Sequence, residues 1–179
     1  MNKIYSNILD MVGNTPILKI NSIDTGLCEL YVKLENLNPG GSIKDRVGLQ
    51  MITDAENKGL LKKGGVIVEC TAGNTGLGLA LAAKLKGYKL ILVIPDKMSK
   101  EKVMHLEAMG VDIIFTRSDV EKGHPEHYQD LAAKIVSETP GAFFTDQFNN
   151  PSNPMIHETT TAVSYTHLRA HETSLQHVC

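Results

Sequence analysis

Three short apolar runs, separated by segments with helical spacing, constrain the fold more than any other feature of this sequence. The runs lie at residues 66–70, 90–94 and 111–115. The first run is apolar enough to form a strand that is buried on both faces, and the other two are also expected to form strands. Strands that alternate with helices predict a parallel sheet with right-handed crossover connections. We therefore expect an α/β fold with a parallel open sheet and flanking helices.

Other elements are expected around these runs. Residues 146–157 are rich in Asn and Pro and predict an ordered connection made of turns. The final stretch, from about residue 163, shows neither strand alternation nor a clear helical stripe. The remaining expected elements are strands at 17–20, 30–35 and 142–144 and helices at 100–109 and 125–138.

The composition excludes several classes of protein. Of the 179 residues, 42% are hydrophobic and 21% are charged, which is typical of a soluble globular protein. A formal net charge of -2 gives no reason to expect nucleic acid or an anionic membrane as partner. No apolar run approaches the roughly 20 residues that a membrane-spanning helix needs, and the first residues lack the apolar core of a signal peptide. We expect a cytoplasmic protein.

Three cysteines, Cys28, Cys70 and Cys179, are scattered along the chain. They are too few for a disulfide framework and lack the spacing of a zinc site, which fits a reducing compartment. His167 and His171 could share one helical face, but no third metal ligand accompanies them. We expect no metal.

A glycine-rich turn at residues 38–41 leads directly into a segment with helical spacing. Ser42 is a candidate N-cap, so Lys44 is expected in the first turn of the helix. A cation is disfavoured there, because the N-terminus of a helix carries partial positive charge. A neutral lysine amine is a nucleophile, and its commonest use is a Schiff base with a carbonyl compound or with pyridoxal phosphate. The alternative is a solvated lysine that follows a turn.

A second glycine-rich loop, residues 71–76, follows the first apolar run and precedes a helix. The free amides at that helix N-terminus would favour an anion. A dinucleotide-binding turn would need Gly-x-Gly-x-x-Gly, whereas residues 73–78 read Gly-x-x-Gly-x-Gly, although Asp96 lies about where a ribose-binding acid could fall. No Lys-Ser or Lys-Thr pair follows the glycines, as a P-loop requires. A nucleotide-binding module without pyridoxal chemistry remains an alternative.

The two loops together resemble the cysteine synthase and cystathionine β-synthase family of pyridoxal-phosphate enzymes, which share the fold-type II architecture of the tryptophan synthase β-subunit. The resemblance runs from about residue 4 to residue 162. The motifs that carry it are Asn-Pro-Gly-Gly-Ser-Ile-Lys-Asp-Arg at 38–46, Thr-Ala-Gly-Asn-Thr-Gly at 71–76, Gly-Asn-Thr-Pro at 13–16, Pro-Asp-Lys-Met-Ser at 95–99, Asp-Gln-Phe at 146–148, Asn-Pro at 153–154 and His-Glu-Thr-Thr at 157–160.

The resemblance implies a cofactor, pyridoxal 5'-phosphate, and a role for two residues toward it. Lys44 matches the Schiff-base lysine, which in this family also removes the Cα proton of the substrate. Asn74 matches the asparagine whose side chain bonds the phenolic oxygen of the cofactor. Both positions lie within the matching motifs.

The resemblance also implies a site for the substrate carboxylate. Thr71, Thr75 and Gln147 match positions that hold this group, and the backbone around Gly73 assists them. Ala72 stands where the family more commonly has serine. This change removes one hydroxyl from the substrate loop and leaves the cofactor contacts untouched.

The implied reaction is β-replacement on O-acetylserine or serine. Sulfide as the nucleophile makes cysteine, which is the first choice; homocysteine, as in cystathionine β-synthase, is the alternative. The implied partners are therefore an amino-acid substrate and a thiol or sulfide, and the parent enzyme is expected to be a homodimer. No nucleic acid or membrane is implied.

The resemblance also predicts a domain organisation. Residues 1–47 belong to a large domain, 48–148 form a small α/β domain and 149–162 begin the return to the large domain. Residues 163–179 resemble translated adapter DNA and are expected to be a non-family tail. The family's second half supplies a glycine-rich loop for the cofactor phosphate and a Ser or Thr for the pyridine nitrogen, and neither is found in this sequence. We therefore expect the N-terminal half only, inactive on its own and with exposed apolar edges.

Overall fold

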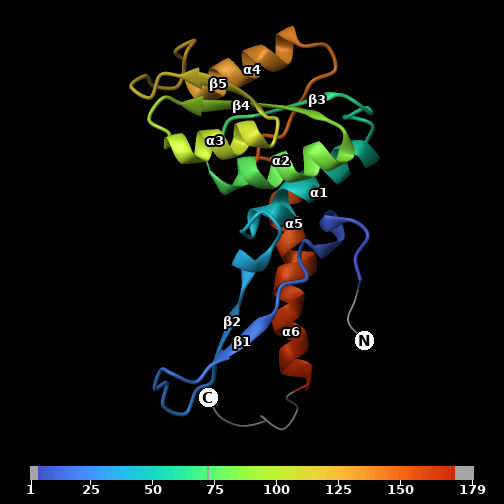
Figure 1. Cartoon of the computed structure of the whole chain (residues 1–179), viewed down its shortest axis with the longest axis vertical. Coiled ribbons are helices and arrows are strands. Elements are labelled where there is room, and N and C mark those ends of the chain that lie inside the picture. The colour runs from blue at the N-terminus through green and yellow to red at the C-terminus, as the bar shows by residue number, and fades with distance from the viewer. Residues whose placement is uncertain (1–3, 72, 172–179) are drawn as a thin grey trace.

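A computed structural model of the chain describes residues 4–71 and 73–171, with side chains as far as residue 166. Ala72 and residues 172–179, among them Cys179, lie outside the described residues, and so do the side chains of His167 and His171. The upper part of the molecule in Figure 1 contains the strands β3 (Val66–Glu69), β4 (Lys89–Pro95), β5 (Asp112–Thr116) and β6 (Phe143–Phe144) and the helices α1 (Lys44–Asn57), α2 (Asn74–Lys86), α3 (Lys100–Ala108) and α4 (Tyr128–Glu138).

The four strands form one sheet in the order β5-β4-β3-β6, and every neighbouring pair is parallel. This confirms the predicted parallel sheet. Val68 of β3 pairs with Ile91 on one side and Phe144 on the other. In Figure 1, α4 covers one face of the sheet, and α2 and α3 lie on the other, with α1 beyond them.

The core explains why the central residues of β3 and β4 are apolar. Ile67 and Leu92 are fully buried in the cluster that packs against α1 and α2, whereas their neighbours Val68 and Val93 are fully buried in the cluster that packs against α4. Side chains alternate across a strand, so a strand covered on both faces needs apolar residues at successive positions.

The lower part of the molecule contains the elements that precede α1 and those that follow β6. The strands β1 (Ile17–Ile20) and β2 (Leu30–Lys33) form an antiparallel pair, and the short 3-10 helices η1 (Ile8–Met11) and η2 (Glu35–Leu37) flank it. At the other end, α5 (Ser152–Ile156), the π-helix η3 (His157–Thr161) and α6 (Ala162–His171) follow one another without a break. α1 packs against both α2 and α5 and so connects the two parts.

Three expectations about local structure were wrong in detail. The segment 146–157, which was predicted to consist of turns, includes the short helix α5. Pro154 is compatible with this helix because it stands in the first turn, where a backbone N–H has no helical acceptor. The stretch after residue 162 is helical to His171, as a continuation of the preceding helix rather than through an apolar stripe of its own. The N-cap of α1 is Ile43, although the Oγ of Ser42 accepts a hydrogen bond from the Lys44 amide at 3.1 Å.

None of the helices in the described part of the chain combines the length and apolar composition needed to cross a bilayer. The same residues contain no group of three or more His, Cys, Asp and Glu side chains placed to hold a metal ion.

Candidate active site

The site is built where α1 and α2 cross backbone to backbone. A Cβ added at Gly78 would lie 2.5 Å from the carbonyl oxygen of Lys44, and one added at Gly48 would lie 2.6 Å from the carbonyl carbon of Gly78. Glycine at these two positions permits the close approach. The first turn of α1, which carries Lys44, therefore lies directly against α2.

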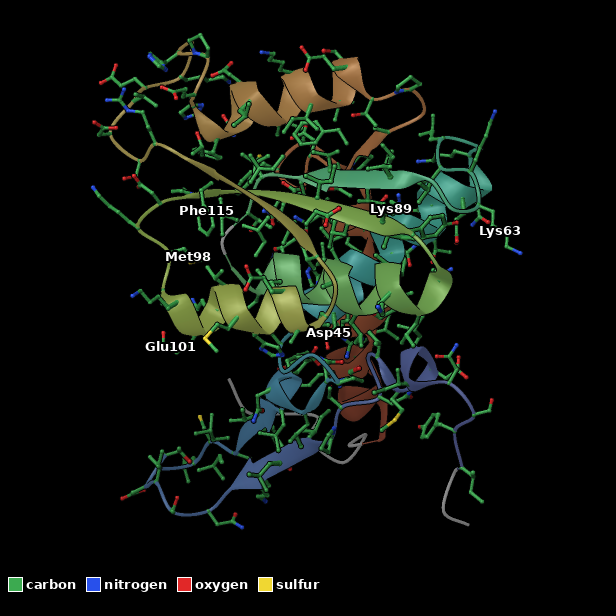
Figure 2. The ribbon with its side chains drawn as sticks, turned by 45° about the horizontal axis from the view of Figure 1, so that its top comes forward. Asp45, Lys63, Lys89, Met98, Glu101 and Phe115 are labelled. Carbon is green, nitrogen blue, oxygen red and sulfur yellow. The ribbon has the colours of Figure 1, made fainter. Side chains whose placement is uncertain are left out.

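Lys44 is the first residue of α1, and its side chain is half-buried. The next residue, Asp45, is 1% exposed and accepts a hydrogen bond through Oδ2 from the Gly40 amide at 2.5 Å. Burial raises the pKa of Asp45, and this hydrogen bond lowers it in part. Figure 2 shows Asp45 at the junction of the upper and lower parts of the molecule. The glycine-rich turn before Lys44 is thus fastened to the residue after it.

The second predicted cofactor residue stands at the start of α2. Asn74 is the first residue of that helix, and its side chain is exposed. Gly78, which touches the backbone of Lys44, comes four residues later, and residues at this spacing share one face of a helix. The structure therefore places Asn74 on the face of α2 that meets the start of α1.

The predicted substrate loop precedes α2. Gly73 is the N-cap of the helix, and its amide donates to the Oγ1 of the half-buried Thr71 at 3.3 Å. The N-terminus of a helix of 13 residues favours a carboxylate through its free amides and its dipole. Ala72, the third member of this loop, lies outside the described residues.

Thr75 and Gln147 are brought together from distant parts of the chain. The hydroxyl of Thr75 donates to the Oε1 of Gln147 at 2.6 Å, and the two residues are 3% and 6% exposed. This hydrogen bond fixes the orientation of the Gln147 amide beside the start of α2. Two of the residues predicted for the carboxylate site are therefore in contact.

A buried acid that the sequence analysis missed supports Gln147. Glu69 is fully buried at the end of β3. Its Oε2 accepts from the backbone N–H of Gln147 at 3.1 Å and from the hydroxyl of Thr145, and its Oε1 accepts from the backbone N–H of Cys70 at 2.8 Å. Between Thr145 and Gln147, Asp146 has a φ of 42°, the left-handed region that is unfavourable for most residues. Glu69 thus holds a strained turn in place. An acid at the end of an apolar run is the signal that could have identified it.

The buried thiol beside this acid is not a candidate nucleophile. Burial raises the pKa of Cys70 to about 12, and the charge of Glu69 adds to the effect. A thiol with this pKa stays protonated at neutral pH, and the thiolate is the reactive form.

His157, in one of the motifs that carry the resemblance, begins the π-helix. Its Nδ1 lies 3.1 Å from the Oγ1 of Thr161. Burial lowers the pKa of His157, and the charges of Lys44 and Arg46 lower it further. The π-helix lies beside the start of α1, where the Nη1 of Arg46 donates to the Oγ1 of Thr160 at 3.1 Å.

The chain matches the family model described as "Pyridoxal-phosphate dependent enzyme" over residues 8–169. It is 48% identical over 164 residues to the cystathionine beta-synthase of Apis mellifera, which covers 90% of this chain and 32% of that protein. It is 50% identical over 159 residues to the cysteine synthase of a Flavobacterium species, covering 88% of this chain and 50% of that protein.

A solved structure supports the same likeness. A hydrogen sulfide-producing enzyme from Fusobacterium nucleatum superposes with a TM-score of 0.82 at 42% identity, over 90% of this chain and 52% of that one. The chain therefore spans between about a third and a half of the length of these relatives.

Proposed function

Because the chain belongs to the family of pyridoxal-phosphate-dependent enzymes, we propose that it carries one wall of a β-replacement site in which Lys44 holds the cofactor. The observation that supports this most directly is the packing of the Lys44 backbone against α2, whose N-terminus carries Asn74 and Thr75. When bound, the cofactor supplies an electron sink for the carbon atoms of an amino acid. The amine, amide and hydroxyl groups present here fit the aldehyde end of such a molecule and the substrate beside it.

Each residue has a distinct task in this proposal. The Nζ of Lys44 binds the cofactor aldehyde and, when it is free, moves the proton at the substrate Cα. The amide of Asn74 donates to the phenolic oxygen of the cofactor. The hydroxyl of Thr71, the side-chain NH2 of Gln147 and the N-terminus of α2 bind the substrate carboxylate, and the hydroxyl of Thr75 contributes by orienting Gln147. Binding the carboxylate at this position orients the Cα–H bond toward Lys44 and so favours elimination at Cβ.

The nucleophile that we propose first is sulfide, with O-acetylserine or serine as the amino-acid substrate and cysteine as the product. The similarity to a cysteine synthase at 50% identity supports this choice. Homocysteine is the second candidate, supported by cystathionine beta-synthases at 48% and 49% identity. For the whole enzyme we propose a homodimer in the cytoplasm.

Reductive trapping tests the assignment of Lys44. The chain is incubated with pyridoxal phosphate, reduced with borohydride, digested and mapped by mass spectrometry. We expect Lys44 to be labelled at lower cofactor concentrations than exposed lysines such as Lys134, whose side chain is 60% exposed. The variant Lys44→Arg should lose the high-affinity label and keep the rest. Labelling that follows exposure alone would rule out Lys44 as the cofactor residue.

A turnover assay tests whether the chain is inactive on its own. The chain is supplied with pyridoxal phosphate, O-acetylserine and either sulfide or homocysteine. We expect no turnover with either thiol, because the phosphate loop that the family resemblance implies is not found in this sequence. Formation of cysteine or cystathionine would identify the nucleophile and show that the expectation of inactivity is wrong.

A further inference from the structure

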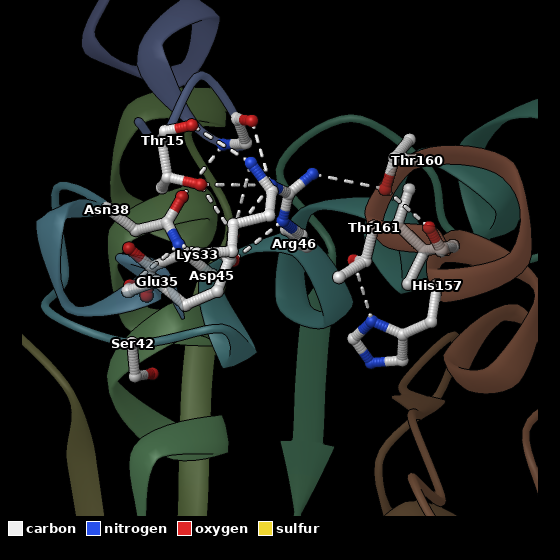
Figure 3. Close-up of polar contacts among 12 residues, drawn as sticks. Thr15, Lys33, Glu35, Asn38, Ser42, Asp45, Arg46, His157, Thr160 and Thr161 are labelled. Carbon is white, nitrogen blue, oxygen red and sulfur yellow. Dashed lines mark hydrogen bonds and ion pairs between the residues drawn. The ribbon is translucent and has the colours of Figure 1, made fainter. Parts of the chain in front are cut away.

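Arg46, two residues after Lys44, makes an extensive set of hydrogen bonds with half-buried partners. It is 5% exposed. Its Nε and Nη2 each donate to one oxygen of Glu35 at 2.8 Å, in the paired geometry of a guanidinium on a carboxylate. Nη2 also donates to the Gly13 carbonyl at 2.8 Å, and Nη1 donates to the Oγ1 of Thr160 at 3.1 Å (Figure 3). One side chain on the first turn of α1 thus contacts three other segments.

Glu35 is held as firmly as its partner. It accepts from the hydroxyl of Thr15 at 2.5 Å and from the side-chain amide of Asn38 at 2.9 Å, and the Nζ of Lys33 lies 3.8 Å away. Burial raises the pKa of Glu35, but the hydrogen bonds from Arg46, Thr15 and Asn38 outweigh this effect and bring the pKa to about 2. The carboxylate therefore stays ionised at neutral pH, and the contact with Arg46 is a charge pair.

The same cluster fixes the turn that leads to Lys44. Asn38 accepts from the Gly13 amide at 2.7 Å through its side chain, and its carbonyl accepts from the Gly41 amide at 2.8 Å. The turn before Lys44 and the helical residues after it are consequently tied to one buried anchor. Lys44 itself lies between these two attachments, with its carbonyl against Gly78.

From this geometry we propose that the Glu35–Arg46 ion pair is a positioning device that fixes the direction of the Lys44 side chain. The inference rests on the proposed function of Lys44, and it gives Glu35 and Arg46 a task although neither touches cofactor or substrate in that scheme. A buried ion pair often contributes little more stability than apolar residues of the same size, whereas the guanidinium and carboxylate planes restrict orientation at both ends. The pair is therefore suited to orienting a neighbour.

The test compares two variants that each remove one carboxylate charge, one paired with the first turn of α1 and one near the end of that helix. Glu35→Gln breaks the pair at the start of α1. Glu56→Gln is the matched control, because Glu56 makes a partly buried ion pair with Lys86 at 2.6 Å near the end of the same helix. Each variant and the wild-type chain, shown to be folded by circular dichroism, is acetylated by a small cofactor-free reagent. Labelling rates at Lys44 and Lys86 are then measured against the exposed Lys134.

We expect a crossed result. Glu35→Gln should raise the acetylation rate of Lys44 about threefold or more without changing Lys86, because a loosened side chain samples solvent more often. Glu56→Gln should change Lys86 and leave Lys44 alone. Trapping by pyridoxal phosphate should instead fall at Lys44 in Glu35→Gln. If both lysines respond to both variants, or if trapping rises together with acetylation, the pair merely stabilises the fold and the proposal is wrong.

Arg46→Lys is the second variant for the same test and replaces Glu35→Gln if that variant does not fold. It keeps the positive charge but loses the planar set of donors, so the same change at Lys44 is expected, and an unchanged Lys44 would overturn the proposal. Failure of the proposed function is separately visible. In that case wild-type Lys44 shows no preferential trapping, while the acetylation rates still decide whether the pair positions it.

Discussion

Glu35 links the stability of the folded chain to pH. Its pKa falls from an ordinary value of 4.5 to about 2 in the folded state, where the hydrogen bonds from Arg46, Thr15 and Asn38 outweigh the effect of burial. A carboxyl whose pKa is lowered by folding stabilises the fold above its unfolded pKa. That stabilisation is lost as the pH falls from about 4.5 toward 2.

The variant Glu35→Gln should therefore lower the free energy of unfolding at pH 7 by about 3 kcal/mol, because Arg46 is left buried without its counter-charge. The difference from wild type should shrink at pH 3, since wild type has by then lost part of the same contribution. Urea unfolding at both pH values measures this. Glu138→Gln, which breaks a surface pair with Lys134, should cost less than about 1 kcal/mol at either pH. A pH-independent difference would contradict the linkage.

Sequence reasoning succeeded for residues whose role depends on their immediate neighbours. Lys44 begins a helix as expected, because a glycine-rich turn followed by helical spacing is a local signal. The partners of buried charges could not be found in this way. Arg46 and Thr160 are 114 residues apart, and Glu69 and Thr145 are 76 apart, so only the folded chain brings them together.

The crossing of α1 and α2 sets the separation of the two glycine-rich loops. Gly78→Ala would place a Cβ 2.5 Å from the Lys44 carbonyl, so one helix must move. We expect the free energy of unfolding to fall by about 2 kcal/mol, the usual cost of overpacking. The high-affinity pyridoxal-phosphate label at Lys44 should weaken as well, because the displaced residue is Lys44 itself.

Gly73→Ala is the control for this change, because an added Cβ there meets no atom within 4 Å. Its effect on unfolding should stay within about 1 kcal/mol, because the only change is alanine for glycine at the N-cap of α2. Alanine has a higher helix propensity than glycine, so an absence of loss in Gly78→Ala, or equal losses in the two variants, would contradict a specific effect of the backbone contact. Urea unfolding and reductive trapping provide the two measurements.

Predictions at the level of elements succeeded where the periodicity was strong. The three apolar runs became β3, β4 and β5 within one or two residues. β3 and β4 are covered on both faces, which requires mostly apolar side chains, whereas β5 is an edge strand in which Phe115 is 53% exposed. α5 and α6 were missed for the opposite reason. Neither has a regular apolar stripe. α5 packs against α1, and α6 continues the helix from η3.

For the molecule as a whole, the antiparallel pair β1–β2 is the region most prone to self-association. Leu18 and Val32 lie opposite each other on neighbouring strands and are 47% and 38% exposed. Within the part of the chain that the structure describes, these strands pair only with each other. A two-stranded sheet with free edges is marginally stable and offers a template for further strands.

The double variant Leu18→Lys with Val32→Glu should weaken this association while adding an opposite-charge pair across the strands. We expect the concentration at which the chain associates to rise about tenfold, a change of roughly 1.4 kcal/mol. Sedimentation velocity over a range of concentrations measures it. Leu85→Lys removes a side chain of similar exposure, 49%, from α2 and should leave association unchanged. An equal shift in that control would point to net charge instead of the β1–β2 surface.

The π-helix between α5 and α6 sets the rotational phase of everything that follows it. A π-turn holds about one residue more than an α-turn, and one residue of an α-helix corresponds to about 100° around the axis. Thr160 meets Arg46 within this wide turn. In a regular α-helix of the same residues, Thr160 would point elsewhere and α6 would present a different face. The wider turn therefore rotates Thr160 into contact with Arg46 in the first turn of α1.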